Sequence, residues 1–443
     1  MSFQQALSGL SAAQVNLDTI GNNVANANTV GFKASTTEFA DVYANTLNGA
    51  ANDQVGMGAR VAQVAQNFSQ GNITTTNNPL DVAINGSGFF RLDNNGVISY
   101  SRNGQFQIDK NGYLVNSNNQ KVTGYGVANG TIQQGVATDL KITTLAAAPK
   151  PTGNLTQSLN LDGRTATVLN PANFDPAQPS TYTNSTTATV YDSQGNSHNL
   201  TSYYMLTAQA DPAAVPPVSQ TWNVFAVLDN VAPGMSVNGT APTAADATTV
   251  PPTAAAYASA QLTFDSAGNM TSPAAGTNIT LGYPTTATTG TAFTATPLSI
   301  NLNLQGTTQY GTSFAVNNLT QDGYAAGQLN NFNIGADGTI NGNFSNGTSQ
   351  PLGQLVLATF NDPNGLTPIG NNAWGQSSLS GQPMVGTPGS GSLGQLQGSA
   401  TETSTVDLTA ELVNMITAQR AYQANAQTIK TEDQILQTIT SLR

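Results

Sequence analysis

One apolar stripe near the carboxyl terminus constrains the fold of this chain more than any other feature. From Leu408 to Leu436, alternating steps of four and three residues meet an apolar or aromatic side chain at most positions, and neither Pro nor Gly interrupts them. This spacing places the side chains along one face of an α-helix. Asp407 and Glu411 in the first turn, and Arg443 at the end, suit the helix dipole. The expected seam consists of Leu408, Leu412, Met415, Tyr422, Ile429, Leu436 and Ile439.

The amino terminus carries a second stripe with the same spacing. Its expected members are Phe3, Leu7, Leu10, Leu17 and Val24. Helices over 1–28 and 405–443 therefore predict a terminal coiled coil, although two ordinary amphipathic helices on a globular core fit the same pattern. Asp18 is the one charged residue before Gly31, and a helix with so little charge is usually covered on more than one side. We expect Gly31 to form a left-handed exit turn after the first helix.

Charged side chains are scarce and unevenly placed. They make up 8% of the chain, against about 25% in ordinary soluble domains. Residues 165–419 contain twelve acidic residues and no Lys or Arg, and the whole chain has a net charge of −11. Because this acidic excess repels phosphate groups, the composition argues against nucleic acid and against anionic membrane surfaces as partners.

The sequence also limits redox chemistry and export. It contains no Cys, which excludes a disulfide framework and thiol catalysis. Its first residues, MSFQQALSGLSAAQ, have neither the basic nor the apolar region of a cleavable signal peptide. No run of about 18 apolar residues suggests a membrane-spanning helix. We expect a protein that either stays inside the cell or leaves it by a route that needs no such signal.

Regularly spaced turns predict a β-rich domain over 71–147. Asn95-Gly96, Asn103-Gly104 and Asn111-Gly112 separate short alternating runs, which is the strongest local signal for β-hairpins. The composition then changes. Residues 148–324 are rich in Thr, Ala and Pro but contain strands of their own. After them, hairpin signals like those of residues 71–147 return.

This order predicts a nested chain that is mainly β with long terminal α-helices. A domain inserted into another has its two ends close together, so the two flanking halves can pair. The expected parts are paired terminal helices at 1–28 and 405–443, a connector at 29–70 and 400–404, a discontinuous β domain at 71–147 and 325–399, and an inserted outer β domain at 148–324.

The chain shows no reactive constellation. His198 is the single histidine, just past a hairpin turn, where a lone surface histidine is usually unremarkable. We expect this inventory to provide no Ser/His/Asp set, no Cys/His cluster and no pair of His ligands. Asp93–Gly96 and Asp109–Gly112 resemble parts of calcium loops but lack the ligand spacing and the distal Glu, and hairpin turns explain them. The cassette Asp-Ser-x-Gly-Asn, at 192 and at 265, indicates repeated turn chemistry. We therefore expect no enzyme activity, no metal and no cofactor. The rival classes are a secreted adhesin or phage-like fibre protein and an extracellular hydrolase.

Several blocks of the sequence resemble one known family. IGNNVANANTVGFK (20–33), FSQGNITTTNNPLDVAINGSGFFRL (68–92), YSRNGQFQIDKNGYLV (100–115) and ELVNMITAQRAYQANAQTIKTEDQILQTI (411–439) are similar to the shared blocks of the bacterial flagellar rod and hook proteins. VYDSQGNSHNL (190–200) resembles the hook members specifically. Rod members are shorter and lack so large an inserted middle, and a distal rod or hook–filament junction protein is the nearest alternative within the family.

The resemblance implies a subunit of the flagellar hook, outside the cell. It implies a curved helical tube of one subunit type that joins the rod to the filament as a universal joint and transmits torque. It also implies unfolded export through the flagellar type III export apparatus and assembly under a hook cap protein, with the distal rod protein and the hook–filament junction protein as neighbours. In this family the paired terminal helices line the tube and the inserted domain faces outward.

Overall fold

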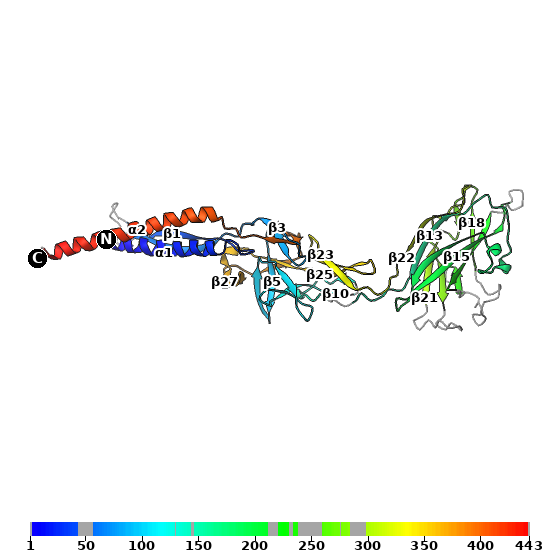
Figure 1. Ribbon diagram of the computed structural model, residues 1–443, viewed down its shortest axis with the longest axis horizontal. Helices are drawn as coiled ribbons and strands as arrows, with labels where there is room; N and C mark the ends of the chain where they lie inside the picture. The colour runs from blue at the N-terminus through cyan, green and yellow to red at the C-terminus, as the bar shows by residue number, and fades with distance from the viewer. Residues whose placement is uncertain are drawn as a thin grey trace. The chain divides into compact units, whose positions relative to one another are not determined.

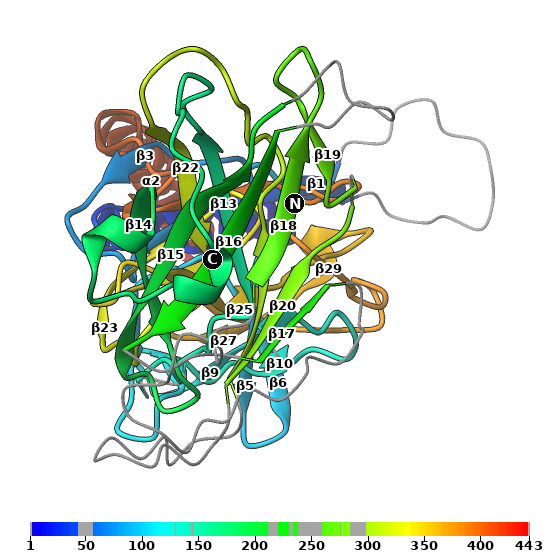
Figure 2. The ribbon, with the colours of Figure 1, turned by 90° about the vertical axis from the view of Figure 1, so that its right-hand side faces the viewer.

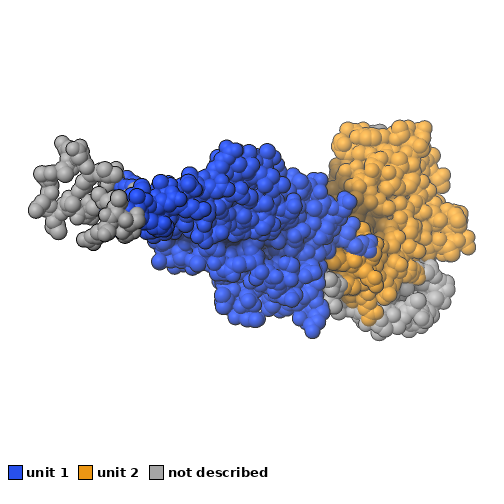
Figure 3. Space-filling view, turned by 60° about the vertical axis from the view of Figure 1, so that its left-hand side comes forward, with its two compact units in different colours: residues 1–144, 330–343, 349–443 blue, residues 145–329, 344–348 orange. Residues whose placement is uncertain are grey.

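A computed structural model divides the chain into two compact units. Unit 1 contains residues 1–144, 330–343 and 349–443, and unit 2 contains residues 145–329 and 344–348 (Figure 3). The expectation of a mainly β fold with long terminal helices is confirmed, whereas the four-part division and its boundaries stay predictions. The structure describes residues 2–42, 56–128, 130–142, 146–210, 220–229, 234–237, 259–274, 276–283 and 298–441.

Both terminal helices form where the apolar stripes predict them. Helix α1 spans Ser2–Ala25 and helix α2 spans Leu408–Ser441, so each is a few residues shorter than expected. Asp407 caps α2, because its carboxylate accepts hydrogen bonds from the backbone N–H groups of Thr409 (2.9 Å) and Ala410 (3.2 Å). This cap explains why the helix begins at Leu408.

The segment expected as a connector after α1 contains a β-hairpin. Strand β1 (Ser35–Val42) pairs antiparallel with β2 (Gly58–Gln66), and both pack on α1 (Figure 1). On the carboxyl-terminal side, the expected connector at 400–404 contains strand β31 (Ala400–Glu402), which pairs with β3 (Ile73–Thr75). Both stretches therefore lie in ordered ladders that lead the chain from the helices into the β part of unit 1.

The rest of unit 1 is built around one large branched sheet. Its main path runs in the order β23-β24-β25-β9-β5-β6-β28-β27. Buried Ile, Leu, Val and Phe side chains form one core cluster, and Phe89, Tyr100, Phe360 and Trp374 are part of a second. The strands and the short helix are β4 (Val82–Asn85), β5 (Phe89–Asn94), β6 (Val97–Ser101), β7 (Phe106–Ile108), β8 (Leu114–Asn116), β9 (Lys121–Tyr125), β10 (Val127–Ala128), β11 (Thr131–Ile132), β12 (Thr138–Asp139), β23 (Leu329–Ile334), β24 (Thr339–Phe344), β25 (Ser349–Leu355), β26 (Leu357–Thr359), η4 (Pro363–Gly365), β27 (Thr367–Gly370), β28 (Ala373–Gly375), β29 (Met384–Gly386) and β30 (Gln395–Gly398).

Two of the three predicted Asn-Gly hairpins are present. Asn95-Gly96 joins β5 to β6 with positive φ at both residues, and Asn111-Gly112 joins β7 to β8. The prediction at Asn103-Gly104 is wrong, because β6 pairs with β28 and not with β7. A Cβ on Gly104 would lie 1.7 Å from the carbonyl oxygen of Val82, so this glycine serves a close backbone approach and not a turn.

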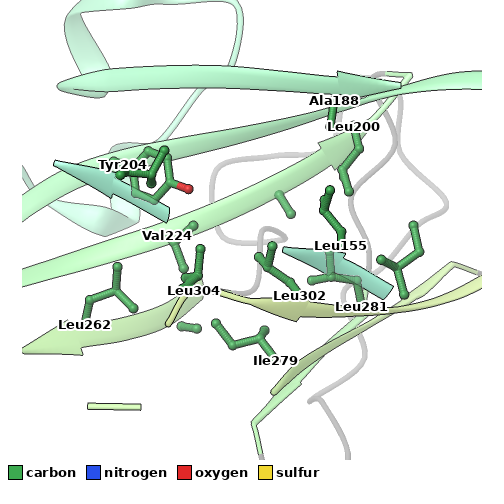
Figure 4. Packing of buried hydrophobic residues seen from close by; sticks show 14 of the residues in the cluster. Leu155, Ala188, Leu200, Tyr204, Val224, Leu262, Ile279, Leu281, Leu302 and Leu304 are labelled. Carbon is green, nitrogen blue, oxygen red and sulfur yellow. The ribbon is translucent and has the colours of Figure 1, made fainter. Parts of the chain in front are cut away.

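Unit 2 contains two five-stranded sheets, ordered β17-β20-β21-β13-β22 and β14-β15-β16-β18-β19. The strands of both sheets can be followed in Figure 2. Their side chains share one large core that includes Leu155, Tyr204 and Leu302 (Figure 4), and Trp222 belongs to the same core. The elements are β13 (Asn154–Asn160), η1 (Pro171–Asn173), η2 (Pro179–Thr181), β14 (Asn184–Tyr191), β15 (Ser197–Ala208), β16 (Thr221–Leu228), β17 (Gly234–Val237), β18 (Ser259–Phe264), β19 (Met270–Ser272), β20 (Ile279–Tyr283), β21 (Leu298–Asn303) and β22 (Ala315–Gln321).

The repeated turn cassette has one geometry at both places. The Asp192 carboxylate accepts hydrogen bonds from the backbone N–H groups two and four residues later, and the Asp265 carboxylate does the same, with distances of 2.8–2.9 Å. The glycine of each cassette has a positive φ. The two turns close the hairpins β14–β15 and β18–β19, which confirms the interpretation as turn chemistry.

Candidate self-assembly surface

The two terminal helices pack against each other in antiparallel directions. Near the end of α1, the Asn23 side-chain amide donates to the Glu411 carboxylate (3.1 Å). Nearer its start, a Cβ on Gly9 would lie only 2.9 Å from Nδ2 of Asn425. The helices approach so closely because α1 presents small side chains to this interface. The most buried side chains of α1 are Ala6, Ala12, Ala13, Thr19, Ile20 and Asn23.

The β1–β2 hairpin covers a second side of α1. Asn23 joins the three elements, since its amide also donates to the carbonyl of Ser35 (2.7 Å) and accepts from its N–H (2.9 Å). Thr37 adds a hydroxyl contact with Thr19 at 3.0 Å. The expectation that an almost uncharged helix is covered on more than one side is confirmed, and both covers belong to the same chain. A groove of 420 Å³ between α1, β1 and α2 remains open beside Phe39 and Ala418.

The predicted seam residues divide into exposed and half-buried positions. Exposed are Phe3 and Leu7 of α1 and Leu408, Leu412 and Leu436 of α2. Half-buried are Leu10, Leu17, Val24, Met415, Tyr422 and Ile429; the side chain of Ile439 lies outside the described residues. The most buried positions of α1 are therefore Asn23, Ile20 and small residues such as Ala6, and the role of the larger seam residues in self-assembly stays a prediction.

Sequence reasoning missed the small-residue face of α1. Ala6, Ala13 and Ile20 recur every seven residues, and Gly9 lies on the same face. This seven-residue spacing indicates close helix packing, but a prediction based on large apolar side chains does not detect it.

A buried ionic cluster joins both helix connections to the β part of unit 1. Lys33 Nζ lies 2.7 Å from Oε1 of Glu402, and Arg102 Nη1 lies 3.3 Å from Oε2 of the same carboxylate. Glu402 also accepts from the backbone N–H of Gly71 (2.7 Å). Lys33 donates further to the carbonyl of Ser69, and Arg102 to a backbone carbonyl of the β4–β5 turn. The side chains of Lys33 and Glu402 are completely buried.

Two cations in this cluster face one carboxylate. Burial lowers the pKa of Lys33, the charge of Arg102 lowers it further, and Glu402 opposes both effects. Burial also lowers the pKa of Arg102, again against Glu402. The excess positive charge makes Glu402 the member whose loss disturbs the cluster most.

Gly31 lies directly beside this cluster. Its φ is +68°, in the left-handed region. Its N–H donates to the carbonyl of Glu402 (2.8 Å), and a Cβ on it would lie 2.7 Å from the carbonyl carbon of Arg102. Gly31 comes six residues after the end of α1 at Ala25, so it shapes the turn that follows the helix and meets the last strand before α2, while its role in assembly stays a prediction.

The described residues show a contact at the single histidine but no metal centre. His198 Nδ1 lies 2.6 Å from Oδ2 of Asp229, which joins β15 to the end of β16. Among the residues that the structure describes, no group of His, Cys, Asp and Glu has the arrangement of a metal site. None of the helices in the described part is long and apolar enough to span a membrane.

Four family models match parts of the chain. Flagella basal body rod protein matches residues 3–33, and Flagellar hook protein FlgE/F/G D1 domain matches 83–147. Flagellar basal body protein FlaE D2 domain matches 160–324, and Flagellar basal body rod FlgEFG protein C-terminal matches 397–442. Their order follows the chain from one terminal helix through both units to the other.

Three relatives that match over the whole length of this chain are named flagellar hook protein FlgE. The chain is 41% identical to flagellar hook protein FlgE of Salmonella typhimurium, and the match covers 100% of both chains. It is 39% identical to the protein of that name from Escherichia coli, over 100% of both, and 32% identical to that from Treponema pallidum, over 100% of this chain and 99% of the other. The crystal structure of Helicobacter pylori flagellar hook protein FlgE2 is similar in fold, with a TM-score of 0.51 and 16% identity, and covers 74% of this chain and 100% of that one.

Proposed function

Because this chain belongs to the flagellar hook protein family and is a structural subunit of the extracellular hook, we propose that copies of it assemble into a curved helical tube. The tube acts as a universal joint that transmits torque from the rod to the filament while it bends. The subunit leaves the cell unfolded through the flagellar type III export apparatus. Its other partners are the hook cap protein, the distal rod protein and the hook–filament junction protein.

The exposure of large apolar side chains on both terminal helices carries this proposal. Phe3, Leu7, Leu412, Val413 and Ile416 are all at least 45% exposed in the single chain. Soluble monomers rarely leave contiguous apolar patches open to water. Contacts with further copies of the chain would bury them, so the helices supply the strong, twist-resistant contacts of the tube.

The surface of unit 2 suits weak contacts that shift between neighbouring copies as the tube bends. Its two basic residues, Lys150 and Arg164, are engaged within the unit by Asp322 (3.1 Å) and Asp162 (2.8 Å). Unit 2 therefore has no further Lys or Arg for ion pairs with a neighbouring copy of unit 2. Contacts from Thr, Ser, Asn and Gln side chains are individually weak, and they can exchange as a bending tube shortens and lengthens each row of subunits.

Electron microscopy of the purified chain tests the proposal. The full chain, concentrated in a salt that favours assembly, should form hollow tubes made of this chain alone. A chain shortened to residues 1–407 is the matched control and should remain monomeric. Monomers or closed trimers of the full chain under all conditions would contradict the proposal and favour the rival fibre class.

A further inference from the structure

The exposed apolar side chains of the terminal helices gather at two separate places. The tip patch consists of Phe3, Leu7, Ile435 and Leu436, near the start of α1 and the end of α2. The base patch consists of Leu408, Leu412, Val413 and Ile416, at the start of α2. Because α1 and α2 are antiparallel, the members of the tip patch come from both helices at one end of the pair (Figure 1).

Polar side chains separate the two patches. Between Ile416 and Ile435, the exposed positions of α2 hold Gln, Thr, Ala, Asp, Arg and Lys, and no large apolar residue. At 1.5 Å per residue, Leu412 and Leu436 are about 36 Å apart along the helix. A single rigid pair of helices therefore cannot bring its own tip patch onto its own base patch.

We infer that the tip patch of one copy packs against the base patch of the next copy, in a head-to-tail contact that rests on the proposed function. A polymer of one subunit type that grows without limit needs two different, complementary surfaces. Two tip patches that met each other would instead close a symmetric dimer and stop growth. The polar stretch between the patches also disfavours contacts shifted towards the carboxyl end of α2, since these place apolar tip side chains against Arg420 or Lys430.

The base patch lies on the face of α2 that points away from α1. At about 100° per residue, Leu408, Leu412, Val413 and Ile416 lie on the opposite side of α2 from Asn414, Ala418 and Ala421, which line the groove between α1, β1 and α2. The base patch is therefore turned away from α1 and the hairpin, where a neighbouring copy can bury apolar surface on it.

Single-cysteine variants test this contact, because the natural chain has no Cys. Val413→Cys marks the base patch, Ile435→Cys marks the tip patch, and Gln423→Cys marks the polar stretch as a control. Each pair of differently tagged variants is mixed, assembled and oxidised. We expect the 413–435 pair to give the dominant disulfide dimer in tubes, and mixtures containing Gln423→Cys to give none above the level in unassembled protein.

A charge exchange gives a second, independent readout. Val413→Asp and Ile435→Lys should each abolish tubes, and the double variant should restore them through an Asp–Lys pair across the contact. Tubes in which like patches are cross-linked, together with a double variant as defective as the singles, overturn the head-to-tail contact and leave the proposed function standing. Failure of the natural chain to form tubes at all overturns the proposed function, and the contact with it.

Discussion

At the scale of single residues, Glu402 balances two buried cations that come from distant parts of unit 1. Its carboxylate accepts hydrogen bonds from Lys33, from Arg102 and from the backbone of Gly71. A buried cluster of this kind need not add much net stability compared with an apolar core, but it becomes costly when one charge is left unpaired. The cluster therefore specifies how the chain segments meet.

Glu402→Gln and Lys33→Met should have unequal effects. Glu402→Gln leaves two buried cations without a counter-charge and should cost about 3–5 kcal/mol of unfolding free energy. Lys33→Met leaves the Arg102–Glu402 pair intact and should cost less. Urea unfolding in a Trp222→Phe background measures this, since Trp374 then reports on unit 1 alone. Equal losses for the two variants would show that charge balance is not what the cluster provides.

Gly31→Val should destabilise unit 1 for two reasons. The positive φ costs a β-branched residue about 1–2 kcal/mol, and the new Cβ meets the Arg102 backbone. Gly21→Ala is the control, because nothing beyond the helix's own backbone lies within 4 Å of its added Cβ and a helical Gly→Ala change stabilises by about 1 kcal/mol. The same urea measurement applies, and a neutral Gly31→Val would mean that the chain can rearrange at this exit turn without loss.

Asp322 should make unit 2 sensitive to acid. Burial would raise its pKa, but the backbone N–H groups of Asn154 and Gly153 and the Lys150 side chain outweigh burial and hold the pKa at about 2. Because the folded pKa lies below the unfolded value, this stabilisation is full above about pH 4 and is lost as the pH falls towards 2. The gap in urea midpoint between the natural chain and Asp322→Asn, read from Trp222 in a Trp374→Phe background, should therefore narrow between pH 5 and pH 2. A constant gap would contradict this assignment.

At the scale of elements, α1 is held by two covers of different origin. Helix α2 covers it from the far end of the sequence, and the β1–β2 hairpin covers it from the adjacent segment. Large apolar side chains remain exposed at the start of α1, at Phe3 and Leu7, and at both ends of α2. Folding of the single chain and contact between chains therefore use different faces of the same helices.

Two substitutions in α2 separate those faces. Ile429 is half-buried on the side that meets α1, whereas Leu412 is 46% exposed. Ile429→Asp should lower the helical circular dichroism of the monomer, because a carboxylate on the contact face disrupts the pairing. Leu412→Asp should leave the monomer spectrum unchanged and abolish tubes. The reverse pattern would mean that the contact faces have been misassigned.

At the scale of the whole molecule, the two units are separate in sequence order and in their hydrophobic cores. Unit 2 interrupts unit 1 in the chain and contains two basic residues, Lys150 and Arg164, against eight acidic ones. Each unit contains its own hydrophobic clusters and one of the two tryptophans. This division supports the proposal that the inserted part is an independent domain.

Residues 148–324 expressed alone should fold cooperatively. The strands of both sheets and Trp222 lie within this range. The thermal transition of the fragment, followed by Trp222 fluorescence, should match the unit 2 transition in a full chain that carries Trp374→Phe. A gradual melt with a random-coil spectrum would refute these boundaries and favour mutual dependence of the units.

The sequence by itself determined the features that depend on short-range patterns. The helices follow from stripes with steps of three and four, and the turns at Asp192 and Asp265 follow from side chains that bond their own backbone. These interactions join residues only a few positions apart, so the local sequence is enough to predict them. The hairpin predicted at Asn103-Gly104 is absent, because Gly104 packs closely against the backbone of Val82, which the local sequence does not indicate.

Tertiary structure alone decided which surfaces meet. Lys33 and Glu402 are 369 residues apart in sequence, and Asn23 and Glu411 are 388 apart, so no periodicity connects them. The choice of the small-residue face of α1 for close packing, and with it the exposure of the larger side chains, depends on the simultaneous presence of α2 and the hairpin. Those elements cover different sides of the same helix, and only their combined geometry in space determines which side chains are buried.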